Sequence, residues 1–213
     1  MASRLYPAYL DLDGRAVLVV GGGRVAARKV SGLLDTGARI TVLAPSPCDD
    51  MEKLAQEGRI VLHNRPYRSE DMSGACLVIA ATDDHEVNHR VSADAADAGV
   101  FCNVVDDPDL CSFQVPAVVH RGLLQIAVST GGASPSLAKR IRQQLEDEFG
   151  PRYATLLDGL MELRQHVQEK HPRDAAKRRQ ILKGFLDSPA PARLLEDGDE
   201  QGFRKLLEEW KNR

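Results

Sequence analysis

The sequence predicts an α/β protein, in which a parallel sheet with helices on both sides is followed by a small strand-and-helix segment and an all-helical domain. Short apolar runs alternate with polar, helix-compatible stretches over residues 16–105, two further strand-like runs follow, and the end of the chain has only helical patterns. We therefore expect three domains, covering residues 1–112, 113–149 and 150–213.

Composition narrows the class of protein. The chain has 213 residues, of which 43% are hydrophobic and 28% charged, as is typical of a protein with a buried core. The formal net charge of −3 gives no general electrostatic reason to bind nucleic acid or an anionic membrane. No secretory signal is visible, and the apolar runs are far shorter than the ~20 residues of a membrane-spanning helix. We expect a cytoplasmic protein without nucleic-acid or membrane partners.

The cysteines and histidines predict no metal site. His85 and His89 are four residues apart but lack a third ligand nearby. Two of the cysteines, Cys76 and Cys102, lie in apolar runs, which indicates buried thiols in a reducing compartment. No CxxC pair occurs among the cysteines, which are Cys48, Cys76, Cys102 and Cys111.

The apolar runs predict five strands buried on both faces, because they are too short for helices and do not alternate with polar residues. A helix is expected over residues 25–36, where Gly37 can stop it, and another over 84–98, with Gly99 as its terminator. The strands are expected at residues 16–20, 39–43, 60–63, 77–81 and 101–105.

The pattern changes after Asp106. Two strands are expected, joined as a hairpin at residues 120–122, and Ser134 can cap a helix that runs to about Phe149. Gly150-Pro151 breaks that helix. The strands are placed at 113–119 and 123–129, the later helices near 153–170, 174–187 and 200–211, and helix breakers at 187–191 and 197–198.

A glycine-rich turn opens the first helix. Gly21-Gly22-Gly23-Arg24-Val25-Ala26 fits the pattern G-x-G-x-x-G/A. The first glycine allows a tight turn, the second lets backbone amides approach a pyrophosphate, and the third small residue lets the helix pack closely on the strand. Alone, the glycines could be a flexible turn. Their place between a predicted strand and a predicted helix favours a Rossmann-like, dinucleotide-binding fold.

The second predicted strand departs from that pattern. It should end in Asp or Glu to hold the adenosine ribose, but Ala44-Pro45-Ser46 stands there instead. Backbone groups or Ser46 would then hold the ribose. Because no Arg or Lys follows this strand to hold a 2′-phosphate, NAD is favoured over NADP.

Four motifs together resemble one family. VGGGRVAARK (20–29), AATDDHEVN (80–88), FCNVVDDP (101–108) and STGGASPSLAKRIR (129–142) occur in this order. The series is similar to the N-terminal module of siroheme synthase and its free-standing relatives, the precorrin-2 dehydrogenases.

The resemblance implies an activity and a partner. Family members oxidise precorrin-2, a tetrapyrrole, to sirohydrochlorin by passing a hydride to NAD, and some also insert Fe²⁺. It therefore implies precorrin-2 as substrate, Fe²⁺ or Co²⁺ as a further substrate in some members, and a homodimer that exchanges its middle segment. The glycine motif predicts Gly21 as a cofactor contact. The further cofactor contacts that the resemblance implies are Gly22, Gly23, Arg24, Val25, Pro45, Ser46, Thr82 and Asp83.

Asp106 is the predicted catalytic residue. The resemblance matches it to the family's essential aspartate, and its place directly after the fifth strand is where open α/β sheets bind ligands. A carboxylate there can act as a base for dehydrogenation and for removing pyrrole N–H protons. From position alone, a solvated turn made by Asp106-Asp107-Pro108-Asp109 is an equal alternative.

Two further segments have structural and functional interpretations. Asp83 is an expected helix cap, with Glu86 reaching back to it. The loop before Ser134 makes a sound helix start, yet its amides can also receive a substrate carboxylate, with basic side chains nearby. The expected substrate contacts are Asn103, His120, Arg121, Ser129, Thr130, Gly131, Ser134 and Lys139.

Two other functions stay open on sequence grounds. An NAD(H)-sensing module would also contain a dinucleotide-binding sheet and a helical appendage, because fold alone does not establish chemistry. A chelatase without dehydrogenase activity would use the same carboxylate as its base.

Overall fold

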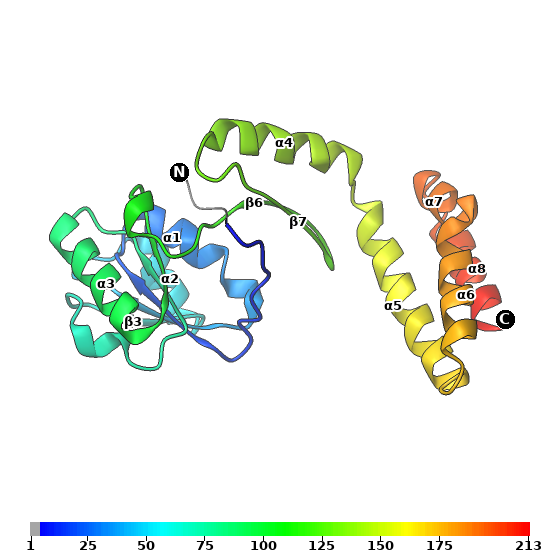
Figure 1. Cartoon of the computed structure of the whole chain (residues 1–213), viewed down its shortest axis with the longest axis horizontal. Coiled ribbons are helices and arrows are strands. Elements are labelled where there is room, and N and C mark those ends of the chain that lie inside the picture. The colour runs from blue at the N-terminus through cyan, green and yellow to red at the C-terminus, as the bar shows by residue number, and fades with distance from the viewer. Residues whose placement is uncertain (1–4) are drawn as a thin grey trace. The chain divides into compact units, whose positions relative to one another are not determined.

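The computed structural model describes residues 5–213 and consists of two compact units, Met1–Val115 and Pro116–Arg213 (Figure 1). Each unit has its own apolar core, with two clusters in the first and one in the second. Among the described residues, none of the helices combines the length and apolarity that crossing a membrane requires. The division into three domains stays a prediction.

The first unit is built on a five-stranded parallel sheet, which confirms the predicted fold class. Its strand order is β3-β2-β1-β4-β5, and β1 pairs on both sides, with Val19 opposite Val42 and Ile79. All but the first residue of β1 are buried, as expected for a central strand covered on both faces. The strands are β1 (Ala16–Val20), β2 (Arg39–Leu43), β3 (Val61–His63), β4 (Leu77–Ala80) and β5 (Phe101–Val104).

Helices cover both faces of this sheet. Successive side chains of β1 point to opposite faces, so Val17 and Val19 join one apolar cluster while Leu18 and Val20 join the other. The first cluster includes buried residues of α1 (Arg24–Ser31) and α2 (Asp49–Gln56), and the second includes those of α3 (His85–Ala98).

Three details of this unit differ from expectation. The first helix ends at Ser31 rather than near residue 36, because Gly32, a poor helix former, follows it as the C-cap. Leu34–Thr36 then forms a separate 3₁₀ helix (η1) before Gly37. The sequence pattern missed α2, which buries only Met51. The N-cap of α3 is Asp84, not Asp83, since Asp84 accepts hydrogen bonds from the amides of Glu86 and Val87.

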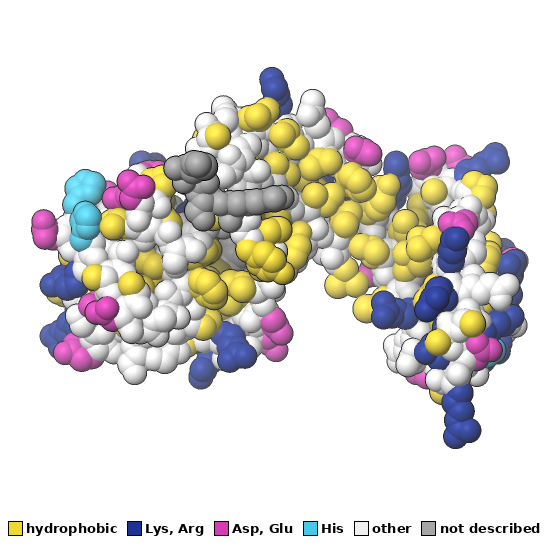
Figure 2. All heavy atoms as spheres, viewed as in Figure 1, with side chains coloured by type: hydrophobic (Ala, Val, Ile, Leu, Met, Phe, Trp, Pro, Cys, Tyr) yellow, Lys and Arg dark blue, Asp and Glu magenta, His cyan; other side chains and the backbone are white. Residues whose placement is uncertain are grey.

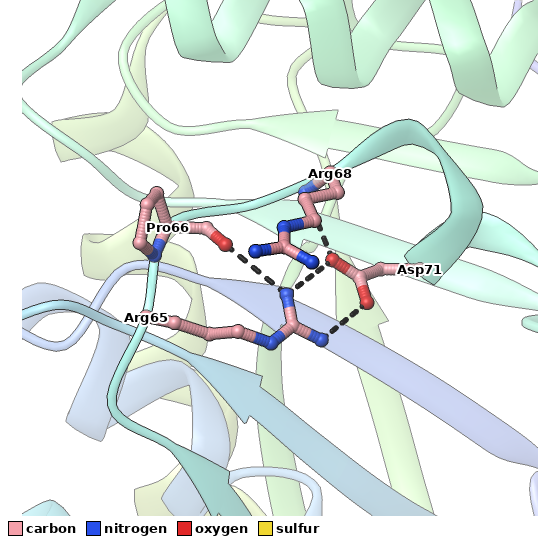
Figure 3. A network of polar contacts seen from close by, with 4 residues as sticks. All are labelled: Arg65, Pro66, Arg68 and Asp71. Carbon is pink, nitrogen blue, oxygen red and sulfur yellow. Dashed lines mark hydrogen bonds and ion pairs between the residues drawn. The ribbon is translucent and has the colours of Figure 1, made fainter.

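The connection from β3 to β4 contains no α-helix. It has only a 3₁₀ helix, Ser69–Met72 (η2), and a network of polar contacts braces it (Figure 3). Both terminal nitrogens of Arg65 donate to the Asp71 carboxylate, at 2.6 and 2.8 Å, and the Arg68 amide donates to the same group at 2.8 Å. Arg65 also donates to the Pro66 carbonyl at 3.1 Å.

The second unit begins with an antiparallel hairpin of β6 (Ala117–Arg121) and β7 (Leu124–Val128), followed by α4 (Pro135–Glu148). Ser134 caps α4, as predicted, by accepting a hydrogen bond from the Leu137 amide. The strand expected from residue 113 starts only at 117. The amide of Phe113 instead bonds to the Cys102 carbonyl in the first unit.

Four helices complete this unit and enclose a core that includes Leu163, Phe185, Phe203 and Trp210. The segment 187–191 was predicted only to break helices, and this prediction is wrong in part: Ser188 caps a further helix, with Pro189 at its first position. The helices are α5 (Arg152–Lys170), α6 (Ala175–Asp187), α7 (Pro189–Glu196) and α8 (Glu200–Lys211).

Candidate functional site

Four turns lie side by side at the carboxyl edge of the parallel sheet. The Gly21 amide donates to Leu43 at 2.9 Å, so the turns after β1 and β2 are adjacent. The Ala81 amide donates to Val20 at 2.7 Å, and the Val105 amide donates to Ala80 at 2.9 Å. These bonds place the turns after β4 and β5 beside the glycine turn, at the edge where open α/β sheets bind ligands.

At Gly21 and Gly22 the close approach of neighbouring atoms leaves no room for a side chain. Gly21 has a φ of +123°, and a Cβ atom there would lie 2.2 Å from the Ala81 carbonyl oxygen. A Cβ atom on Gly22 would lie 2.5 Å from that of Ala44. The two glycines therefore let the turn pass between the ends of β4 and β2.

Gly23 differs from its two neighbours, because space is open around it. It is the exposed N-cap of α1, with a φ of −77°. Apart from its chain neighbours, none of the described residues comes within 4 Å of the position that its Cβ would take. No side chain of residues 5–213 caps this helix. The backbone N–H groups at the start of a helix attract anions, so this cradle fits the pyrophosphate of a dinucleotide.

The other expected cofactor contacts lie at the same edge. Pro45 and Ser46 are exposed directly after β2, and Asp83 is exposed after β4. Thr82 is fixed by Asn88: its hydroxyl donates to the Asn88 Oδ1 at 2.8 Å, and the Asn88 amide donates back to the Thr82 carbonyl at 2.9 Å. Sequence reasoning missed Asn88, although AATDDHEVN ends on it.

Asp106 follows β5 and is exposed at this edge. It is the one non-glycine residue among residues 5–213 with a positive φ, +62°. This left-handed conformation costs an L-residue about 1–2 kcal/mol, although Asp tolerates it better than most. The backbone thus holds the carboxylate in a turn that a larger apolar residue would not adopt.

A half-buried lysine on α1 is electrostatically coupled to this turn. Burial lowers the pKa of the Lys29 amine, and the charge of Arg28 lowers it further. The Asp106 carboxylate and Cys111 act in the opposite direction. Lys29 belongs to the motif VGGGRVAARK, but no pattern in the sequence indicates that it is half-buried.

Asn103, an expected substrate contact, is buried within β5. Its amide nitrogen donates to the Phe113 carbonyl at 3.1 Å and lies 3.5 Å from the Cys111 sulfur. Its N–H groups are therefore directed at the chain that follows Asp106.

The remaining expected substrate contacts belong to the second unit. In the loop before α4, the Ser129 hydroxyl accepts from the Gly131 amide at 3.1 Å, and Thr130 and Ser134 exchange two hydrogen bonds of 3.1 Å. The loop is thus built as a helix start, as the structural interpretation expected.

Three basic residues of this unit have different surroundings. Lys139 on α4 and His120 at the end of β6 are exposed. Arg121 instead donates to the His120 carbonyl at 2.7 Å and to the Glu146 carbonyl at 3.2 Å, so it ties the hairpin to the last turn of α4.

Comparisons with known proteins identify similar families. Residues 8–117 match a family described as "Putative NAD(P)-binding", and residues 121–148 match one described as "Sirohaem biosynthesis protein central". Siroheme synthases from Methylococcus capsulatus and Ectopseudomonas mendocina are 42% and 41% identical to the chain over 95% of its length. The chain spans 42% and 43% of these relatives' length.

A solved structure titled "SirC, precorrin-2 dehydrogenase" has 28% identity and a TM-score of 0.76, and the match covers 96% of this chain and 100% of that one. The match extends over both units, and the predicted resemblance to the siroheme synthase family is confirmed. The chain belongs to the NAD(P)-binding family that matches residues 8–117, and over 95% of its length it is similar to siroheme synthases.

Proposed function

We propose that this chain catalyses the NAD-dependent oxidation of precorrin-2 to sirohydrochlorin, a step of siroheme biosynthesis. The observation that carries the proposal is the position of Asp106. Its exposed carboxylate follows β5 at the sheet edge that also bears the glycine turn. The likeness to siroheme synthases and to SirC supports the same reaction.

The cofactor site is assigned to the turns after β1, β2 and β4. NAD, when bound, supplies the acceptor for a hydride. The amides at Gly23, Arg24 and Val25 bind its pyrophosphate, helped by the positive end of the α1 dipole. Pro45 and Ser46 border the ribose, and Thr82 and Asp83 flank the cofactor from β4. No Lys or Arg occurs from residue 44 to 48 to pair with a 2′-phosphate, which favours NAD.

Asp106 is assigned the role of accepting the proton that the oxidation releases. The reaction removes a hydride and a proton from the substrate, and a positioned carboxylate accepts the proton as the hydride leaves. General-base assistance of this kind typically contributes 10²–10⁴-fold to a rate. Lys29 lies on the helix that starts at the pyrophosphate turn, and its positive charge attracts the Asp106 carboxylate.

The second unit is assigned part of the substrate contacts. Precorrin-2 carries several carboxylates, which need donors and positive charge in a chain of net charge −3. The exposed Gly131, together with Lys139 and His120, offers both on this unit. Ser129, Thr130 and Ser134 shape the loop that presents these amides, and Arg121 fixes the hairpin.

We further propose a homodimer in the cytoplasm. A two-stranded hairpin is marginally stable by itself, and further pairing would stabilise β6 and β7. Figure 2 shows hydrophobic side chains exposed over the second unit, where the large ones include Leu123, Met161 and Leu186. The four free cysteines fit a reducing compartment. Light scattering after size exclusion tests the dimer; a mass of 23.3 kDa would contradict it.

The decisive experiment replaces Asp106 with Asn and follows NADH formation by absorbance after precorrin-2 and NAD are mixed with the protein. We expect NAD binding to survive and the rate to fall about 10²-fold or more, in line with loss of a general base. Asp109→Asn is the matched control, because Asp109 is an exposed carboxylate in the 3₁₀ helix Pro108–Leu110 that follows the turn, and its loss should leave full activity.

Two outcomes would contradict the proposal. An active Asp106→Asn protein removes this residue from the mechanism. No NADH formation by the unmodified protein, despite NAD binding, favours a nucleotide-sensing module. A parallel incubation with sirohydrochlorin and Fe²⁺ or Co²⁺ tests for the metal insertion that some family members perform.

A further inference from the structure

The chain that follows Asp106 turns back and runs along the free edge of β5. After a 3₁₀ helix at Pro108–Leu110 (η3), Ser112 bonds to Cys102 in both directions: its amide donates to the Cys102 carbonyl at 2.9 Å, and its hydroxyl accepts from the Cys102 amide at 2.8 Å. We name residues 111–113 the return segment. It satisfies backbone groups of the last strand, which has a partner strand on one side only.

The first residue of the return segment, Cys111, contacts the backbone on both sides of Asp106. Its sulfur accepts a hydrogen bond from the Val104 amide at 3.2 Å. The same thiol lies 3.2 Å from the carbonyl oxygens of Val104 and Asp107, so its S–H can donate to either. The two residues between these contacts are Val105 and Asp106. The thiol therefore closes the base of the turn that carries the carboxylate.

Two further observations fit a bracing role. Burial raises the pKa of the Cys111 thiol, so the S–H remains available as a donor at neutral pH. Asn103 extends the brace, because its buried amide donates to the Phe113 carbonyl at 3.1 Å. A left-handed residue outside glycine persists only where the surrounding structure holds it, and the contacts of Cys111 hold the backbone on either side of Asp106.

We propose that Cys111 is a positioning residue for the reaction: its thiol holds the left-handed turn of Asp106 and thereby fixes the carboxylate at the substrate. The inference rests on the proposed role of Asp106 as the base. It treats Cys111 neither as a nucleophile nor as a metal ligand, since its sulfur is directed at backbone groups of its own turn.

The test compares Cys111→Ala, Cys111→Ser and the matched control Cys76→Ala. Cys76 is also partly buried but packs against the apolar cluster that includes Val17 and Leu77. We expect Cys111→Ala to lower kcat about tenfold, equivalent to about 1.4 kcal/mol, with the Kd for NAD unchanged. Cys111→Ser, which keeps a donor and an acceptor, should recover part of this loss. Cys76→Ala should keep its kcat even if its thermal midpoint falls.

A second measurement reads the turn directly. Hydrogen exchange should accelerate at the amides of Val105 and Asp107 in Cys111→Ala, while the amides of α1 stay protected. An unchanged kcat in Cys111→Ala, or equal losses in the alanine and serine variants without faster exchange in this turn, overturns the proposal. If Cys111→Ala does not fold, the serine variant and its exchange pattern decide.

The Asp106→Asn variant separates this inference from the proposed function. If that variant stays fully active, the assigned base is wrong whatever Cys111 does. If it is slow but measurable, adding Cys111→Ala should cause little further loss, because a positioning residue acts through the group that it positions. If the losses in kcat are additive in the double variant, the positioning role of Cys111 is contradicted, while the proposed role of Asp106 is not.

Discussion

Arg65 binds Asp71 through both of its terminal nitrogens, at 2.6 and 2.8 Å, and so closes the connection between β3 and β4, which contains no α-helix (Figure 3). A fork-to-fork pair of this kind fixes orientation as well as distance. The Arg68 amide adds a third donor to the same carboxylate. This brace takes the place of the helix that usually packs such a crossover onto a parallel sheet.

We predict that Asp71→Asn lowers the thermal midpoint of the first unit at neutral pH. The hydrogen bond from Arg65 lowers the pKa of the Asp71 carboxyl, and the Arg68 amide acts in the same direction. The resulting stability is present above the ordinary pKa of 3.8 and is lost as the pH falls through the lowered pKa. The gap between wild type and variant should therefore close in acid. Glu57→Gln, in a 4.0 Å exposed pair with Lys53, should change little.

The glycine turn offers a matched pair of substitutions. Gly21→Ala should impair folding, because its Cβ would lie 2.2 Å from the Ala81 carbonyl oxygen and its φ is +123°. Gly23→Ala should leave the thermal midpoint nearly unchanged but weaken NAD binding about tenfold, or about 1.4 kcal/mol, since the methyl group enters the space assigned to the pyrophosphate. Calorimetric titration with NAD checks this, and unaltered affinity in Gly23→Ala would place the pyrophosphate elsewhere.

Lys29→Met should raise stability while it lowers turnover. Because burial lowers the pKa of Lys29, the unfolded chain binds this proton more tightly than the folded chain, and the charged form costs stability at neutral pH. That cost fades as the pH rises through the lowered pKa toward 10.5, so the advantage of methionine should shrink in alkali. Thermal melts across this range, with NADH formation measured at neutral pH, check both parts. The exposed Lys53→Met serves as the control, and a less stable Lys29→Met would contradict the reasoning.

Gly159→Ala tests the core of the second unit. A Cβ atom there would lie 2.8 Å from the Phe203 ring, and overpacking of this kind costs about 1–3 kcal/mol, partly offset by the roughly 1 kcal/mol that alanine gains over glycine within a helix. Fluorescence of Trp210, the single tryptophan, reports unfolding of this unit in urea. Gly32→Ala, whose nearest neighbour would be at 3.5 Å, should be neutral or stabilising.

Much of the sheet could be predicted because its strands are buried on both faces. The bounds of β1 and β2 follow directly from continuous apolar runs. The helices were harder to place. Gly32 ended α1 earlier than its apolar spacing indicated, and α2 buries too little apolar surface to leave a periodic pattern.

The sheet edge that carries the candidate site could be predicted from the sequence, but the backbone conformation and burial of its residues could not. The glycine motif and the strand ends indicate one edge of the sheet, and Gly23 and Asp106 both lie there. No pattern in the sequence shows that Asp106 has a left-handed backbone, because this depends on contacts made by Cys111. The partial burial of Lys29 likewise arises only when α1 packs against the sheet.

The backbone of Asp106 has a consequence for protein engineering. At a φ of +62°, glycine is the residue that the main chain itself would prefer. A redesign that ranks substitutions by folding free energy would therefore choose glycine at position 106. The resulting protein would be more stable but would lack the proposed general base. Screens for a more heat-stable variant of this protein should keep Asp106 unchanged, because the substitution that most stabilises the backbone there would abolish the proposed catalytic activity.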